Sequence, residues 1–225
     1  MQIRLFKPFR GWRQLSGEVG IIVLGVLIAL GAEQIVQTLN QRREVRELRA
    51  AVDNEIGYGI GTHDARLKQE VCVEARLAEL DQWLQSWRAG DPKMLTGTIS
   101  APRSGPPHSS VWASRDPEVM SHMPLQVKLA YGSIYDEFAN NEVQRLDERM
   151  TWLALAEYDG ADQLDVANMM RLRGLITRAR WRSKNISGNA VYIAGLAKQK
   201  GIKPQPNEFS ASETAELCRP ILQKS

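Results

Sequence analysis

The sequence predicts an all-α protein with one N-terminal transmembrane helix that continues into a stalk, followed by a soluble bundle of three to four helices. Two observations predict this class. A single apolar run, residues 19–32, stands out near the N-terminus, and nothing of comparable hydrophobicity follows it. Beyond it, apolar residues recur at intervals of three and four, whereas the alternation typical of a half-buried strand is absent from the sequence.

The apolar run is the candidate membrane anchor. Its uncharged core, between Glu18 and Glu33, holds 14 residues, a length that also fits a buried helix. Extended to 15–36 it would span about 33 Å at 1.5 Å per residue, which is enough to cross a bilayer. Because the run is apolar around its whole circumference, it does not suit the edge of a soluble core. A cleaved signal peptide remains an alternative, since a basic start and the small residues Ala29 and Gly31 also fit that pattern.

The residues around the anchor indicate what it contacts. Aromatic and cationic side chains before it suit the headgroup region of a bilayer, and we expect four interfacial anchors: Phe9, Arg10, Trp12 and Arg13. Within the anchor, Gly25, Ala29 and Ala32 recur at intervals of four and three, a spacing that lets two helices approach closely. This face predicts a homodimer or contact with another integral membrane protein.

Charge alone does not orient the anchor, because basic residues both precede and follow it. The cysteines favour one orientation. Cys72 and Cys218 lie far apart and form no C-x-x-C motif, so they are either a disulfide or two buried thiols. A disulfide requires an oxidising compartment such as the periplasm. We therefore expect a bacterial inner-membrane protein, single-pass, with its N-terminus in the cytoplasm and its C-terminal domain in the periplasm.

The chain divides where its composition changes. Helical spacing continues past the anchor to about residue 56 and then meets Gly57-Tyr-Gly-Ile-Gly61. This stretch lacks the preceding strand and the spacing of a dinucleotide-binding loop, so it predicts a joint or a helix-packing patch. The expected divisions are a basic head (1–14), a transmembrane helix (15–36), a stalk and joint (37–62), a helical bundle (63–202) and a C-terminal segment packed on the bundle (203–225).

Within the bundle, the spacing predicts helices over 63–89, 110–121, 124–158 and 162–200, and a short helix over 211–218. A loop rich in proline and serine occupies 91–109. For the helix over 124–158 we expect the following residues to face the core: Val127, Tyr131, Ile134, Phe138, Leu146, Met150 and Leu153.

No catalytic, cofactor-binding or metal-binding pattern is visible in the sequence. His63, His108 and His122 form neither H-x-x-x-H nor H-E-x-x-H, and none pairs with a nearby cysteine. A nucleophile elbow, G-x-S-x-G, is also missing from the sequence. Asp136 and Glu137 are adjacent on a helix and point about 100° apart, so they do not face one substrate. We therefore expect a protein that is not an enzyme and carries no cofactor or metal.

One predicted helix is crowded with arginine. Arg171, Arg178 and Arg182 follow helical spacing, which suits either a patch that binds an anionic partner or a solvated face balanced by nearby acids. The net charge of +3 is weak evidence for a polyanionic partner, and a periplasmic domain does not meet nucleic acid. The expected partners are the lipid bilayer and other integral membrane subunits or a second copy of the chain, with no nucleic acid.

Two stretches carry a resemblance to a known group of proteins. Gly17-Glu18, then Leu24-Gly-Val-Leu-Ile-Ala-Leu30 and a charged helix, resembles the N-termini of uncharacterised Gram-negative single-anchor membrane proteins. The stretches around Val111-Trp112-Ala113 and Met123-Pro124 resemble the middle of the same proteins. The resemblance implies an uncleaved anchor and a helical outer domain. It implies no activity and no site residues.

These observations together predict a structural or interaction protein, an accessory subunit or scaffold of a larger inner-membrane complex. The anchor face and the segment 91–123 are the expected contact surfaces. The alternative is a periplasmic sensor or ligand-binding module that uses the interior of the bundle. Because a 14-residue head is too short to be an output domain, such a sensor has to signal through a partner.

Overall fold

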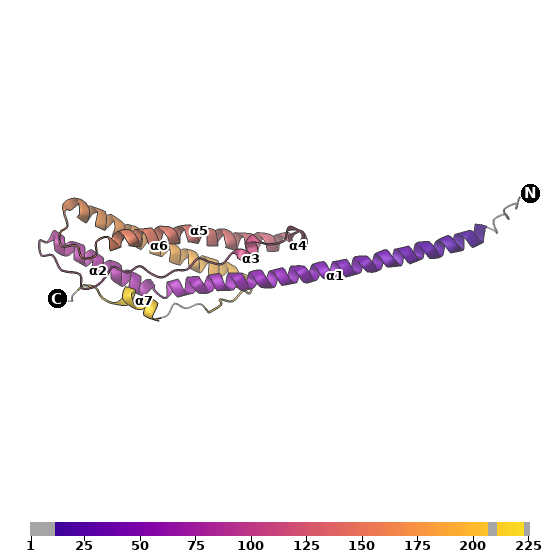
Figure 1. Cartoon of the computed structure of the whole chain (residues 1–225), viewed down its shortest axis with the longest axis horizontal. Helices are drawn as coiled ribbons and strands as arrows, with labels where there is room; N and C mark the ends of the chain where they lie inside the picture. Colours follow the sequence, from indigo (N-terminus) through magenta and orange to yellow (C-terminus); the bar gives the residue numbers. More distant parts are fainter. Residues whose placement is uncertain (1–11, 207–210, 223–225) are drawn as a thin grey trace, which may run out of the picture.

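The structure, a computed structural model, describes residues 12–206 and 211–222, and within those ranges it holds seven helices and no named strand (Figure 1). The expected all-α class is confirmed. One long helix projects from the end of an elongated bundle, so the described part of the molecule is a rod with the start of that helix at its tip (Figure 1). Two of the expected interfacial anchors, Phe9 and Arg10, lie outside the described residues, and Trp12 and Arg13 open the first helix.

Helix α1, Trp12–Leu67, is the projecting element, and its 56 residues span about 84 Å. Its apolar N-terminal part includes an 18-residue window of mean hydropathy 2.3, and no residue of that window is buried against protein. By length and composition α1 is thus able to cross a membrane. The alternative of a buried core helix is wrong, because the run makes no contact with the bundle (Figure 1).

The glycine stretch 57–61 is a packing surface. We expected a joint or a packing patch there, and the joint is wrong, because α1 continues unbroken to Leu67. A Cβ added at Gly59 would lie 2.5 Å from the Phe138 ring, so the missing side chain is what admits the ring. The break comes later, at Lys68 and Gln69, and the bundle begins earlier than residue 63, since Val52 and Ile56 are fully buried.

Three helical layers make the bundle. Helix α2, Glu70–Arg88, continues roughly in line with α1 beyond the break, while α5, Leu125–Ala156, and α6, Val166–Gln199, run alongside as an antiparallel hairpin (Figure 1). Gly160 makes the hairpin turn with φ +70°, a conformation that favours glycine. Asp165 then begins α6, because its side chain accepts a hydrogen bond from the backbone N–H of Asn168.

Short helices cover the sides of this bundle. The predicted helix over 110–121 is two helices, α3, Ser110–Ala113, and α4, Pro117–Ser121, because Asp116 caps a new N-terminus by accepting from the Glu118 N–H. Glu55 of α1 holds α3 in place by accepting hydrogen bonds from Ser110 Oγ, Val111 N–H and Trp112 N–H. It also accepts from the Tyr135 hydroxyl of α5. Helix α7, Ala211–Cys218, lies along α2 (Figure 1).

Apolar burial is divided into two clusters along the rod. The cluster nearer the apolar part of α1 is built on α1, α5 and the end of α6, and it includes Ile56, Phe138 and Ile193. The distal cluster is built on α2, α5, the start of α6 and α7, and it includes Trp83 and Trp152. The helix break at Lys68 and Gln69 falls between the two clusters, where the buried residues are polar and charged.

The expected loop 91–109 is an extended segment pinned along the bundle. The Trp83 indole N–H donates to the Lys93 carbonyl, and the Ile99 N–H donates to Asp159. Gln69 bonds both backbone groups of Arg103, at 2.8 Å each. Ile99 is buried, so the segment contributes to the distal cluster as well as covering it.

The expected core face of α5 is correct for its first half and wrong for its second. Tyr131, Ile134 and Phe138 are buried as predicted, but Leu146, Met150 and Leu153 are exposed. Their place inside is taken by the following residues: Asn141, Glu148, Thr151, Trp152 and Leu155. The prediction failed because it placed polar side chains outside, whereas this part of α5 turns a glutamate inward toward an arginine of α1.

Candidate functional site

A buried polar layer separates the two apolar clusters. Arg66 of α1 donates to Glu148 of α5 through two nitrogens, Nη2 to Oε1 at 2.5 Å and Nε to Oε2 at 3.3 Å. The side chains are 3% and 2% exposed. The Ser183 hydroxyl of α6 accepts from Arg66 and donates to Glu70, so one hydrogen-bonded chain joins α1, α5, α6 and α2. This layer therefore sets how all four long helices meet.

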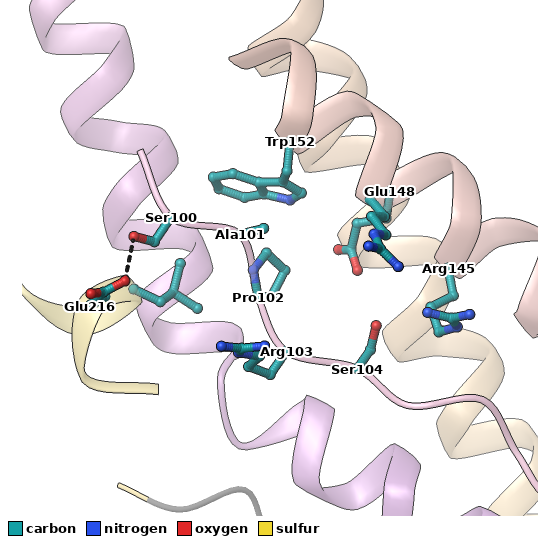
Figure 2. Close-up of a pocket in the computed structure, with 11 residues that line it drawn as sticks. Ser100, Ala101, Pro102, Arg103, Ser104, Arg145, Glu148, Trp152 and Glu216 are labelled. Carbon is teal, nitrogen blue, oxygen red and sulfur yellow. Dashed lines mark hydrogen bonds between the residues drawn. The ribbon is translucent and has the colours of Figure 1, made fainter. Parts of the chain in front are cut away.

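A surface cleft of about 370 Å³ opens beside this layer, between the extended segment and α5, with α7 at its end (Figure 2). Its lining comes from three parts of the chain: residues 100–104, then Arg145, Glu148, Arg149 and Trp152 of α5, and Glu216 and Leu217 of α7. The α5 residues are spaced i, i+3, i+4 and i+7, so one helical face supplies them all.

The cleft presents more donors than acceptors. Trp152 is 1% exposed, and its indole Nε1–H finds no hydrogen-bond partner within the described part of the chain. Figure 2 shows the indole above residues 100–102, with its nitrogen toward Glu148. Both Glu148 oxygens are already engaged by Arg66. Arg145 is neutralised by Glu142 at 2.5 Å, whereas the guanidinium groups of Arg103 and Arg149 form no ion pair with any described residue.

A second, smaller cavity of about 10 Å³ lies behind the cleft and shares Ser104 and Arg145 with it. It is lined by His63 and Asn141, whose Nδ1 and Nδ2 atoms have no partner among the described residues. Burial lowers the pKa of His63 to about 4. The imidazole is thus neutral at physiological pH, and the cavity beside it is about the size of one water molecule.

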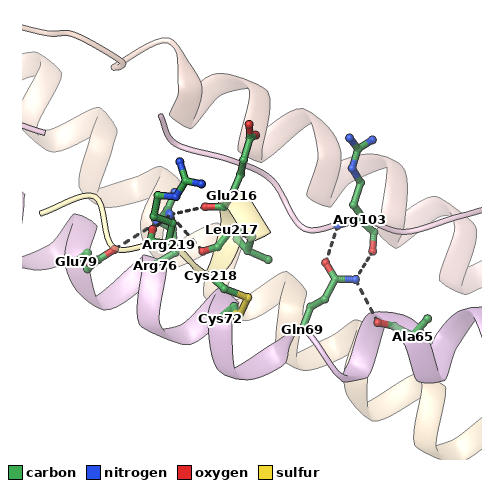
Figure 3. Close-up of a disulfide and its surroundings, with 10 residues drawn as sticks. All are labelled: Ala65, Gln69, Cys72, Arg76, Glu79, Arg103, Glu216, Leu217, Cys218 and Arg219. Atoms are coloured by element: carbon green, nitrogen blue, oxygen red, sulfur yellow. Dashed lines mark hydrogen bonds and ion pairs between the residues drawn. A yellow bond between two sulfur atoms is a disulfide. The ribbon is translucent and has the colours of Figure 1, made fainter. Parts of the chain in front are cut away.

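A disulfide fixes the α7 wall of the cleft. Cys72 of α2 and Cys218 of α7 are bonded, with their Cα atoms 4.8 Å apart (Figure 3). The predicted pairing is therefore present in the structure. Beside it, Arg76 is 1% exposed and donates to backbone carbonyls of the C-terminal segment and of Thr98; the C-terminal acceptors are Glu216, Leu217 and Arg219. One arginine and one disulfide thus tie α7 and the extended segment to α2.

The predicted arginine patch is a balanced face. Arg171 pairs with Glu157 at 2.8 Å, and Arg178 and Arg182 both contact Asp147 of α5. These contacts favour the second of the two alternatives, a face balanced by nearby acids. The pKa of Asp147 is lowered: partial burial opposes ionisation, but the hydrogen bonds and charges of Arg178 and Arg182 outweigh it.

The predicted helix-packing residues lie on the uncovered part of α1. Gly25, Ala29 and Ala32 are exposed, and a Cβ added at Gly25 would meet no other atom within 4 Å. The face is therefore open to a second helix. Whether a helix binds there stays a prediction.

The outer face of α5 is a further unpartnered surface. From Leu125 to Leu153, positions recur at alternating intervals of four and three, the repeat of a coiled-coil helix. Six large apolar residues on these positions, here called the outer seam, are between 46% and 68% exposed: Leu125, Leu129, Val143, Leu146, Met150 and Leu153. Asp136 and Ala139 occupy the middle of the repeat and are also exposed.

Sequence reasoning missed the cleft and the polar layer. Arg145, Glu148, Arg149 and Trp152 share a helical spacing that was visible, but no feature of the chain indicated which face of α5 would turn inward. The described residues contain no group of histidine, cysteine or acidic side chains able to hold a metal ion. No protein-family model, curated protein or solved structure matches this chain.

Proposed function

We propose that this chain is an accessory subunit or scaffold of a larger membrane complex, held in the bilayer by α1 and bound to its partner through the outer seam of α5. The observation that carries the proposal is the seam itself. It runs about 42 Å along the helix at 1.5 Å per residue. Exposed apolar residues that recur along one helix face, here in two groups on either side of Asp136, are typical of a binding surface.

The occupant of the seam is a helix of a different protein, and Asp136 supports this choice. Two copies anchored in one bilayer are parallel, and a two-fold axis between them places identical residues opposite each other. The two Asp136 carboxylates would then meet in the middle of the seam. A like-charge pair at this position is unfavourable, whereas a partner helix with lysine or arginine opposite Asp136 removes the repulsion.

The proposed location is the inner membrane of a Gram-negative bacterium, with the bundle in the periplasm. The Cys72–Cys218 disulfide supports an oxidising compartment. A membrane-impermeant maleimide tests the orientation in spheroplasts. A Ser109→Cys variant, exposed on the extended segment, should react at once, whereas a cysteine added at the N-terminus should react only after permeabilisation. The opposite pattern would place the bundle in the cytoplasm.

The seam is tested by a photo-reactive amino acid at Leu146, with the same group at Val71 as control. Val71 is exposed on α2 and lies outside the seam. The Leu146 position should cross-link one integral membrane protein in native membranes, and the Val71 position should not. Adducts of equal yield at both positions, or a product of twice the chain mass alone, would contradict the proposal.

A matched pair of variants then tests binding energy. Met150→Lys places a charge in the seam, and Val191→Lys places the same charge on an exposed apolar site of α6. With the cross-linked partner purified, Met150→Lys should weaken binding at least tenfold and Val191→Lys should not. Equal affinity for both variants and the wild type would remove the seam as the interface.

A further inference from the structure

We propose that the cleft between residues 100–104 and α5 binds a small hydrophilic molecule through a carboxylate or phosphate group. The anion accepts hydrogen bonds from the Trp152 indole N–H and from the guanidinium groups of Arg103 and Arg149. This site is independent of the outer seam. It gives the chain a ligand in addition to a protein partner.

The donor inventory supports an anion. A buried N–H is normally hydrogen-bonded in folded proteins, yet the Trp152 donor has no acceptor in the described structure. The carboxylates around it are already engaged. Glu148 is held by Arg66 at two points, and Glu216 accepts from the Ser100 hydroxyl at 3.5 Å (Figure 2). An acceptor from outside the chain would therefore supply the hydrogen-bond partner that the Trp152 indole N–H lacks.

The charges around the cleft point in the same direction. Arg145 and Arg66 are each balanced by a carboxylate, so they add little net charge. Arg103 and Arg149 make no described ion pair, and together they exceed by one charge the single unpaired carboxylate of the lining, Glu216. They come from opposite walls, one from the extended segment and one from α5. Two guanidinium groups on facing walls suit the planar, bidentate recognition of a carboxylate or phosphate.

Size and rigidity suit a small molecule. A volume of about 370 Å³ is within the range of small-molecule sites in proteins. The walls are held in place without the ligand: Gln69 clamps the backbone of Arg103, and the disulfide holds α7 (Figure 3). Because both walls are pinned, binding needs little ordering of the chain. The polar lining excludes an acyl chain or another purely apolar ligand.

The indole N–H of Trp152 is a direct probe of the site. The full chain, with ¹⁵N-labelled tryptophan and in detergent micelles, shows separate indole resonances, and a Trp152→Phe variant identifies the one from Trp152. Sodium phosphate and sodium glucuronate are added in turn at constant ionic strength, with glucose as the neutral control. We expect a saturable shift of the Trp152 resonance with at least one anion and none with glucose; the stronger anion distinguishes a phosphate ligand from a carboxylate ligand.

Variants on the cleft wall decide whether the shift comes from this site. Arg103→Gln combined with Arg149→Gln should weaken the apparent affinity at least tenfold, whereas Arg173→Gln, at an exposed arginine of α6 outside the cleft, should leave it unchanged. Arg103 and Arg149 make no ion pair with a described residue, so we expect their replacement to leave the fold intact. Three results overturn the proposal: no saturable shift with either anion, an equal shift with chloride, or an unchanged affinity in the double variant.

Discussion

Arg66 and Glu148 are 82 residues apart in the sequence and form a two-point ion pair in the centre of the bundle. The pair joins α1, which carries the segment able to span a membrane, to α5, which carries the outer seam and one wall of the cleft. A buried ion pair adds little net stability when intact, but removing one partner leaves an uncompensated charge. We therefore expect the ion pair to fix how α1 and α5 pack against each other, as well as to contribute to stability.

Replacing Glu148 with glutamine tests this role. The change leaves Arg66 buried without its main counter-charge, and we expect a loss of about 3 kcal/mol in the free energy of unfolding. The control is Glu157→Gln, which breaks the exposed pair with Arg171 and should lose less than about 1 kcal/mol. Urea unfolding of the full chain in micelles, followed by near-ultraviolet circular dichroism, measures both. Equal losses would show that burial of the Arg66 pair has no energetic consequence.

Removing the disulfide should destabilise the bundle and release α7 first. The bond closes a loop of 146 residues, and loss of a native disulfide of this kind costs about 2–5 kcal/mol. The measurement compares the wild type with a Cys72→Ser, Cys218→Ser variant, with and without reductant. Reductant should lower the stability of the wild type and leave the double variant unchanged. Two free thiols in denatured, unreduced wild-type protein would show that the bond does not form.

A glycine-to-alanine pair tests the close contact between α1 and α5. Alanine at position 59 would place its Cβ 2.5 Å from the Phe138 ring, and forcing the ring aside should cost about 1–3 kcal/mol. Gly174, on α6, has no atom within 4 Å of an added Cβ. There the same change should stabilise the protein by up to about 1 kcal/mol, because alanine is the better helix former. Thermal unfolding of both variants gives the sign of each change in stability. A stabilised Gly59→Ala variant would contradict the close contact between Gly59 and Phe138.

Acid should destabilise the bundle through His63. Its pKa is lowered to about 4 by burial, and in the unfolded chain it returns to about 6.5. The unfolded state therefore binds the proton first, and stability falls as pH drops from about 6.5 to 4, by at most about 3 kcal/mol. Above pH 6.5 this contribution is constant.

The pH effect is isolated by subtraction, since acidic residues also titrate in this range. The difference in unfolding free energy between wild type and His63→Gln should change between pH 7 and pH 4. A His63→Gln difference that stays constant with pH would mean that the imidazole is not desolvated.

Some features follow from local residues, and the structure agrees with them. The 14 apolar residues after Glu18 lie outside the bundle, and the proline-rich segment 91–109 forms no helix. Asp159 and Gly160 lie in the turn that follows α5. Each depends on intrinsic backbone preferences or on hydrophobicity over a short window. Backbone preferences and local hydrophobicity can be read directly from the sequence.

The outer seam and the cleft were decided by tertiary contacts. Helix α5 has apolar residues on two faces, and its periodicity alone favoured Leu146, Met150 and Leu153 as core. The inward face is instead the one with Glu148 and Trp152, because Arg66, brought alongside by the continuation of α1 through its glycines, needs a carboxylate once it is buried.

By itself the sequence determined the helical class, the N-terminal segment able to span a membrane, the positions of most helices and the presence of two cysteines able to pair. The tertiary structure alone decided which face of α5 is buried, that the glycine stretch is a contact, and that three arginines and a tryptophan line one cleft. The physical reason is how far apart in the sequence the interacting residues lie. Helix formation and membrane affinity are set by neighbours within a few turns, whereas burial of a charge depends on a counter-charge that the chain supplies 82 residues away.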